Sequence, residues 1–149
     1  MPPQQLVRVV LDTNQIVGAG TRWLDRGVPS PDHNIQRRIL IRVAEVHAGL
    51  YCGKIIGEYL EKLVDIRHPA ERSVMMIAYI MGAFNPVVIT TKAAPHPPSD
   101  PDDEIFLLCA MDGLANYLVS EDHALVNLKS KYPSFVIGRS ADLAKSLGA

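Results

Sequence analysis

Four acidic residues lie far apart along the chain, at positions where a carboxylate can serve a ligand: Asp12, Glu58, Asp103 and Asp122. Asp12 follows an apolar, β-branched run over 6–11, which is typical of a central parallel strand. Because ligands collect at the carboxyl ends of such strands, this carboxylate is placed for binding rather than for packing. Asp122 follows a second apolar run over 117–120 and is expected near the same edge of the sheet.

The other two acids lie on predicted helices. Glu58 lies one turn past the start of a helix expected over 54–66, among apolar neighbours. Asp103 is delivered by a proline-rich loop to the start of a helix expected over 104–112. Helix starts that follow strands gather at the carboxyl edge of a parallel sheet, so the four acids can meet there.

A cluster of carboxylates indicates a bound divalent cation, Mg²⁺ or Mn²⁺. Mg²⁺ takes oxygen ligands and is commonly held by a few carboxylates together with substrate phosphate. Such an ion polarises a phosphodiester, generates a hydroxide nucleophile and stabilises the leaving oxygen, so no serine or cysteine nucleophile is needed. Carboxylates that lie close together repel one another unless a cation is present. The acids therefore favour a metal-dependent nuclease.

Each acid taken alone also has a simpler interpretation. Asp12 can belong to a turn at a strand end, and Glu58 can be a solvent-facing helix residue. Asp103 can be an ordinary acid favoured by the dipole at a helix start, and Asp122 can be a helix cap. The order and surroundings of the four acids, rather than any one of them, carry the prediction.

The elements that must position these acids alternate along the chain. Strands are expected over 6–11, 50–52, 86–90, 117–120 and 135–137. One helix is expected to begin after Asn34, which would cap it, and another is expected around 22–26. Further helices are expected over 54–66, 69–81, 104–112, 124–129 and 141–147, and Ser140 would cap the last of them. Glycines and prolines predict a long irregular stretch over 15–33. The alternation predicts an α/β protein with a parallel sheet covered by helices on both faces.

Composition bounds the class of protein. The chain has 149 residues, a formal net charge of −1 and no apolar run near the roughly 20 residues of a membrane helix. A cytoplasmic protein of one domain, over 1–149 and with no membrane segment, is expected. The charge argues against binding nucleic acid mainly through bulk positive charge, but bound cations reverse the local field, so a nuclease stays open. Cys52 and Cys109 are expected to be buried, reduced thiols.

Four segments resemble the motifs of PIN domains. The segment 9–14 (VVLDTN) resembles their opening motif, and 58–63 (EYLEKL) is similar to the helix that carries their second acid. The segment 100–110 (DPDDEIFLLCA) resembles their third motif, and 115–122 (ANYLVSED) their fourth. The resemblance spans nearly the whole chain and keeps the order of the motifs.

The resemblance implies a three-layer α/β/α fold with a central, mostly parallel sheet. It implies a Mg²⁺- or Mn²⁺-dependent endoribonuclease that hydrolyses phosphodiester bonds of single-stranded RNA, often as the VapC-like toxin of a toxin–antitoxin pair. The implied partners are an RNA substrate and an antitoxin protein. A homodimer is expected from the family and from the apolar helix around 75–81.

The resemblance also implies roles for individual residues. The four acids would be catalytic and metal-binding, with Asp103 preferred to Asp102 because of its spacing from the apolar residues of the following helix. Two polar residues would orient ligands or substrate: Asn14 and Ser120. Contacts with the RNA backbone are expected from four arginines, whose alternative is a solvated helix face: Arg22, Arg26, Arg37 and Arg38.

Some residues depart from the family pattern, and two other functions stay open. Glu121 stands where a small residue is usual, Ala124 where another acid often follows, and Gly53 where Ser or Thr commonly begins the helix. The first alternative is a catalytically silent PIN-like module that binds RNA or protein. The second is a phosphatase-like hydrolase, although the sequence after Asp12 lacks the DxD spacing expected there.

Overall fold

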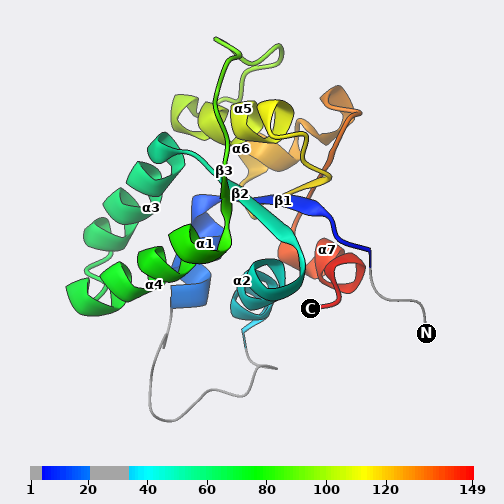
Figure 1. The fold of residues 1–149 in the computed structure, drawn as a ribbon. Coiled ribbons are helices and arrows are strands. Elements are labelled where there is room, and N and C mark those ends of the chain that lie inside the picture. The colour runs from blue at the N-terminus through cyan, green and yellow to red at the C-terminus, as the bar shows by residue number, and fades with distance from the viewer. Residues whose placement is uncertain (1–4, 21–33) are drawn as a thin grey trace.

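The computed structural model describes residues 5–20 and 34–149 (Figure 1). Its strands are β1 (Arg8–Leu11), β2 (Ala48–Tyr51), β3 (Asn85–Pro86), β4 (Tyr117–Val119) and β5 (Val136–Gly138). Its α-helices are α1 (Thr13–Gly20), α2 (Ile35–Val46), α3 (Gly53–Asp65), α4 (Ala70–Ala83), α5 (Glu104–Asp112), α6 (His123–Val126) and α7 (Ser140–Leu147). Two short 3₁₀ helices are η2 (Pro101–Asp103) and η3 (Lys129–Lys131).

The sheet is parallel throughout and has the strand order β3-β2-β1-β4-β5. The buried, β-branched residues of β1 place it at the centre, where Leu11 pairs with Val119 of β4. The chain builds the sheet outward from β1 in one direction as far as β3 and then in the other through β4 and β5. The boundary between β1 and β4 is therefore the switch point at which open α/β sheets bind ligands.

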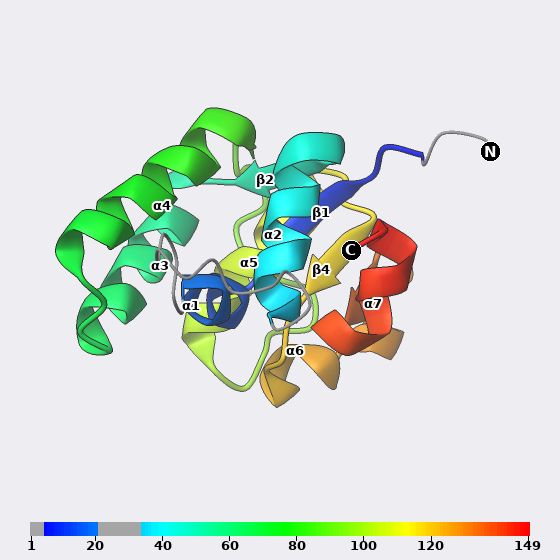
Figure 2. The same ribbon diagram turned by 90° about the horizontal axis from the view of Figure 1, so that it is seen from below.

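Helices cover both faces of this sheet. Figure 1 shows α5 on one side of β1 and α2 with α7 on the other, and Figure 2 shows α2 and α7 side by side beneath the strands. Helix α3 packs against α1, α4 and α5. The predicted three-layer α/β/α arrangement with a parallel central sheet is thus confirmed.

Helix α1 occupies the first part of the stretch 15–33, where the prediction of an irregular segment is wrong. Two glycines in this segment disfavour a helix in isolation. Packing overrides that preference, because α1 contacts α2 and α3 and buries Ile16 and Ala19 completely. The short helix predicted around 22–26 lies outside the described residues.

The third strand is shorter than the predicted 86–90. Pro86 has no N–H to donate to a neighbouring strand. The backbone N–H groups of Thr90 and Thr91 donate instead to the carboxylate of Asp112, at 2.7 and 2.9 Å. This loop is therefore fixed by a side chain rather than by the sheet.

The helix caps were predicted with mixed success. Asn34 caps α2 as expected, since its side chain accepts a hydrogen bond from the N–H of Arg37. Ser140 does not cap α7, because the cap position belongs to Arg139. The N–H and hydroxyl of Ser140 donate instead to the carboxylate of Glu121.

One buried histidine joins the first strand to the last helix. Nδ1 of His47 accepts a hydrogen bond from the N–H of Val7 at 3.2 Å, and Nε2 donates to the carbonyl of Leu147 at 2.9 Å. His47 precedes β2, so this junction lies at the amino edge of the sheet.

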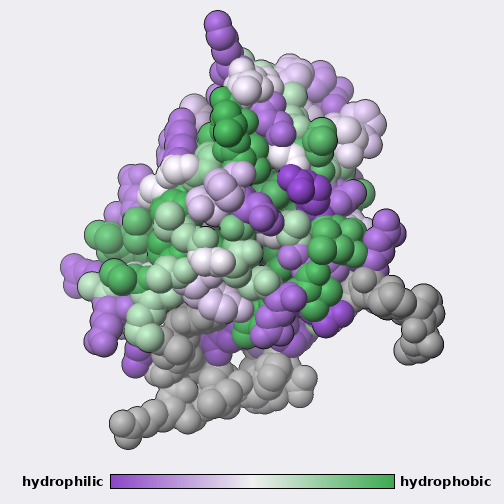
Figure 3. All heavy atoms as spheres, in the orientation of Figure 1, coloured by the Kyte–Doolittle hydropathy of each residue, from purple (hydrophilic) through white to green (hydrophobic). Residues whose placement is uncertain are grey.

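Three further findings concern the surface and the core. No helix in the described part of the chain is long and apolar enough to cross a membrane. Both Cys52 and Cys109 are buried and free, as predicted. The exposed residues of α4 include Val74, Met75 and Met81. Figure 3 shows apolar side chains over the region where α4 lies.

Candidate active site

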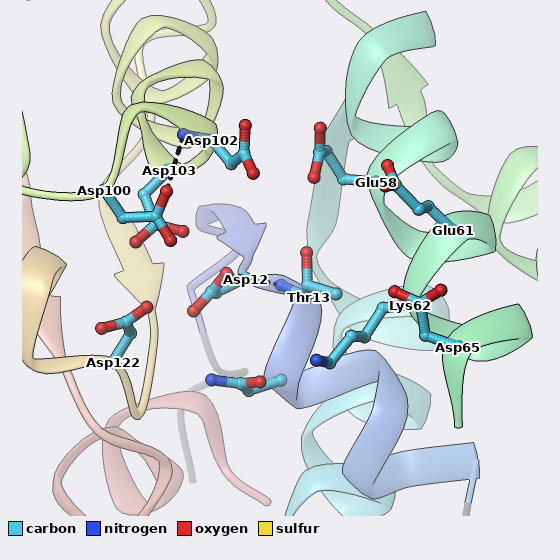
Figure 4. A pocket seen from close by; sticks show the side chains of 11 residues that line it. Asp12, Thr13, Glu58, Glu61, Lys62, Asp65, Asp100, Asp102, Asp103 and Asp122 are labelled. Carbon is cyan, nitrogen blue, oxygen red and sulfur yellow. Dashed lines mark hydrogen bonds between the residues drawn. The ribbon is translucent and has the colours of Figure 1, made fainter.

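An acidic cavity of about 220 Å³ opens at the carboxyl edge of the sheet (Figure 4). Eight of its eleven described lining residues are Asp or Glu, so the cavity is strongly negative. The acids are Asp12, Glu58, Glu61, Asp65, Asp100, Asp102, Asp103 and Asp122. The other lining residues are Thr13, Asn14 and Lys62.

Asp12 lies at the base of the cavity, directly after β1, and is 2% exposed. Its Oδ2 accepts a hydrogen bond from the hydroxyl of Ser120 at 2.6 Å, and its Oδ1 accepts one from the N–H of Thr13 at 2.6 Å. Burial raises the pKa of Asp12 to about 6, although both hydrogen bonds act in the opposite direction. The carboxylate is therefore fixed in orientation but costly to ionise.

Ser120 connects two of the acids. It is fully buried, and while its hydroxyl donates to Asp12, its Oγ accepts a hydrogen bond from the N–H of Asp122 at 3.0 Å. The side chain of Asp122 accepts from the N–H of Ala124 at 2.9 Å and so caps α6. Asp122 is thus a helix cap, as the simpler interpretation of its sequence position suggested, and it also lines the cavity.

The loop before α5 brings three acids to the wall of the cavity that faces α3 (Figure 4). The side chain of Asp100 accepts from the N–H of Asp102 at 3.0 Å and starts the 3₁₀ turn η2. Asp103 is 7% exposed, and its buried Oδ2 has no hydrogen-bond partner among the described residues. Burial raises the pKa of Asp103 to about 8, with the nearby Asp122 and Asp12 adding to the effect.

Helix α3 supplies the third wall, and one tyrosine sets its position. The hydroxyl of Tyr59 donates to the carbonyl of Leu11 at 2.5 Å, and its ring stacks on Phe106 of α5 at 6.4 Å between ring centroids. The adjacent Glu58 then faces the cavity across from Asp102 (Figure 4). Burial, followed by the charge of Asp102, raises the pKa of Glu58.

The structure brings all four predicted acids to one cavity, together with Asn14. Ser120 does not line the cavity but holds Asp12. Arg37 and Arg38 lie on α2 away from the cavity lining, and Nε of Arg37 donates to the carbonyl of Ala19 at 3.2 Å. The other two predicted arginines, Arg22 and Arg26, lie outside the described residues.

Several lining residues were not predicted from the sequence. Glu61, Lys62 and Asp65 follow Glu58 at spacings of three, four and seven, which places them on one face of α3. This helical spacing was the signal that could have found them. Asp102, passed over in favour of its neighbour, also lines the cavity.

The lining fits a hard divalent cation held partly through water. In the described part of the chain, no three His, Cys, Asp or Glu side chains lie close enough together to hold a metal ion as they stand. Mg²⁺, however, usually keeps several waters and needs only one or two carboxylates. The ionisable lining residues are carboxylates and a lysine, and the unpartnered Oδ2 of Asp103 offers an oxygen that a cation would satisfy.

Comparisons with known proteins agree with the fold described above. No curated protein matches the chain. A chain from the crystal structure of VapBC2 from Rickettsia felis, bound to a DNA fragment from their promoter, is similar in fold, with a TM-score of 0.56 and 13% identity. The match covers 89% of the present chain and 98% of that chain. A model of the PIN domain matches residues 8–124, which include every described residue of the acidic cavity, and the chain therefore belongs to the PIN domain family.

Proposed function

We propose that this protein is a single-domain, metal-dependent endoribonuclease that hydrolyses phosphodiester bonds of single-stranded RNA. Proteins of the PIN domain family are generally nucleases. The observation that carries the proposal is the convergence of Asp12, Glu58, Asp103 and Asp122, from four separate segments, on one cavity at the switch point of a parallel sheet.

Asp12, Glu58 and Asp103 would hold Mg²⁺ or Mn²⁺, with Asp122 acting directly or through water. When bound, the ion polarises the phosphodiester and makes hydroxide available at neutral pH. Ser120 keeps the Asp12 carboxylate from rotating, since it holds Oδ2 while the N–H of Thr13 holds Oδ1. Asn14, exposed at the cavity rim, would orient the RNA strand.

The two buried carboxyls link cation binding to proton release. With a pKa of about 8, Asp103 keeps a proton at neutral pH while no cation is present. The proton must leave before the carboxylate can act as a ligand. Cation affinity should therefore rise with pH through neutrality.

The partners follow from family likeness. The similar structure contains VapBC2 with promoter DNA. By analogy, the present chain would be the toxin of a toxin–antitoxin pair, with an antitoxin protein as its partner. We propose a homodimer as its assembly, formed through the exposed apolar residues of α4.

The decisive experiment is cleavage of a single-stranded RNA with Mg²⁺ or Mn²⁺. Asp12→Asn should lower kcat/KM at least about a hundredfold, because it removes a carboxylate at the centre of the cavity. Asp142→Asn is the matched control, since Asp142 is exposed on α7 and does not line the cavity. Products should carry a 5′-phosphate and a 3′-hydroxyl.

The same preparation separates the proposal from the silent-module alternative. A silent module should bind RNA without cleaving it and show no stabilisation by divalent cations. Equal cleavage by wild type and Asp12→Asn would remove the proposed site.

A further inference from the structure

Lys62 is a cation placed among the carboxylates of the cavity. It lies on α3, four residues after Glu58, and the described lining holds this one cation beside eight acids. An RNA phosphate approaching the cavity therefore meets mainly like charge, which repels it. A fixed positive group at the rim would offset that repulsion for the approaching strand.

A local ion pair within α3 is the ordinary structural role for such a lysine. Residues three or four positions apart are neighbours on a helix, so Glu58 and Asp65 are the expected partners. Figure 4 shows a different arrangement: the ammonium of Lys62 is directed away from Glu58, Glu61 and Asp65 and toward the start of α1. The side chain is exposed, so its ammonium is accessible to a ligand from solution.

The position of the ammonium also separates it from the proposed metal ligands. In Figure 4 it lies below Thr13, on the side of the cavity that α3 forms, whereas Asp103 and Asp122 lie on the other side. A group there is placed to contact the strand next to the reacting phosphate rather than the reacting phosphate itself. Lysine ammonium groups bind phosphate as point charges, without the fixed geometry that arginine requires.

We propose that Lys62 is a substrate-binding residue whose ammonium contacts a non-bridging oxygen of the RNA phosphate that flanks the scissile one. The inference rests on the proposed ribonuclease function and deepens it. A contact with a flanking phosphate strengthens ground state and transition state equally, so its loss raises KM and leaves kcat nearly unchanged.

The test compares RNA cleavage by wild type, Lys62→Gln and Lys62→Arg across a series of KCl concentrations. Lys62→Gln should raise KM about tenfold, the loss expected when a hydrogen bond between charged groups is removed. Its plot of log kcat/KM against log salt should be less steep by about 0.7, the change for one phosphate contact on a single strand. Lys62→Arg should keep most of the wild-type KM.

The matched control is Lys145→Gln, since Lys145 is exposed on α7 and does not line the cavity. A substrate with one neutral methylphosphonate, moved along the strand, completes the test. At the contacted position, the methylphosphonate should raise the KM of the wild-type protein as much as the substitution Lys62→Gln does. It should not raise the KM of the Lys62→Gln variant any further.

Two results would overturn the inference, and they differ from each other. If Lys62→Gln and Lys145→Gln change KM and the salt slope equally, Lys62 makes no specific contact, although the ribonuclease function stands. If wild type cleaves no single-stranded RNA with either metal, the proposed function fails and the role of Lys62 fails with it.

Discussion

Asp12 and Asp103 are buried carboxyls whose surroundings disfavour their charged forms. The pKa values of about 6 and about 8 lie above the 3.8 of an exposed Asp. From a pH near 3.8 up to about 8, the folded protein binds more protons than the unfolded chain. The free energy of unfolding therefore falls as pH rises through this range. Fold stability is thus given up for a site that can receive a cation, as is common where pKa values are shifted for function.

This cost predicts a stabilising substitution. Asp103→Asn removes the buried charge, so at pH 8 and without divalent cations it should raise Tm by about 3–6 °C, which corresponds to about 1.5 kcal/mol. The gain should shrink as pH falls toward 4, where Asp103 is protonated in the folded protein. Thermal unfolding at several pH values in a chelating buffer measures the effect.

The control for this prediction is Asp142→Asn, which neutralises an exposed acid of α7. It should change Tm little at either pH. A Tm of Asp103→Asn below that of wild type at pH 8 would contradict the argument that the Asp103 charge is a burden on the folded protein.

Helix α3 carries four of the eleven described lining residues, and Tyr59 joins this helix to the central strand. The bond from the Tyr59 hydroxyl to Leu11 joins residues 48 positions apart in the chain. It connects the helix to the last residue of β1, next to Asp12. This buried hydrogen bond therefore joins the wall formed by α3 directly to the base formed by β1, in addition to the packing of α3 on α1, α4 and α5.

Tyr59→Phe should lower the free energy of unfolding by about 1–3 kcal/mol, because the carbonyl of Leu11 then lacks this partner in the buried core. Cation affinity should also fall, since the α3 wall loses its fixed position. Denaturant unfolding and Mg²⁺ titration would measure the two effects. Tyr117→Phe is the control, since the Tyr117 hydroxyl has no hydrogen bond to a described residue; equal losses in both variants would refute this role of Tyr59.

Local sequence signals predicted the elements that local physics determines. The helix 104–112 was predicted with its observed bounds, because acids at its start and a glycine at its end mark both limits. The core of β1 was visible as an apolar run. Helix α1 was missed because its glycines disfavour a helix and its stability comes from packing on α2 and α3.

The candidate site was predictable only in part. The four acids were found from their motif order, and strand order then explains why they meet. The other cavity residues of α3 were missed although their helical spacing from Glu58 marks the same face of the helix. Glu121 is another example: it departs from the family pattern because its carboxylate accepts from Ser140 of α7 and from Gln15 of α1. Burial raises the pKa of Glu121, but these hydrogen bonds outweigh it and leave the pKa below its usual value.

The surface of the folded chain carries a stripe of uncharged residues along α4. Val74, Ala78 and Met81 are exposed at spacings of four and three, so they lie on one side of the helix. A stripe without charge is self-complementary, which suits the two-fold contact of a homodimer.

The double substitution Val74→Glu with Met81→Glu should convert the proposed dimer to a monomer in light scattering. Its Tm at low protein concentration should match that of wild type, since both side chains are exposed in the monomer. Val88→Glu, at a position 82% exposed and away from α4, should leave the dimer intact. A monomeric wild type would contradict the assembly.

The junction made by His47 indicates where a fusion partner or a solid support can be joined to the protein. It holds the beginning of the first strand against the end of the last helix, at the edge of the sheet opposite the acidic cavity. A fusion partner or sensor surface joined at the C-terminal end would therefore leave the cavity open to solution. Protein immobilised through this end should accordingly be suitable for measuring RNA binding while it stays on the surface.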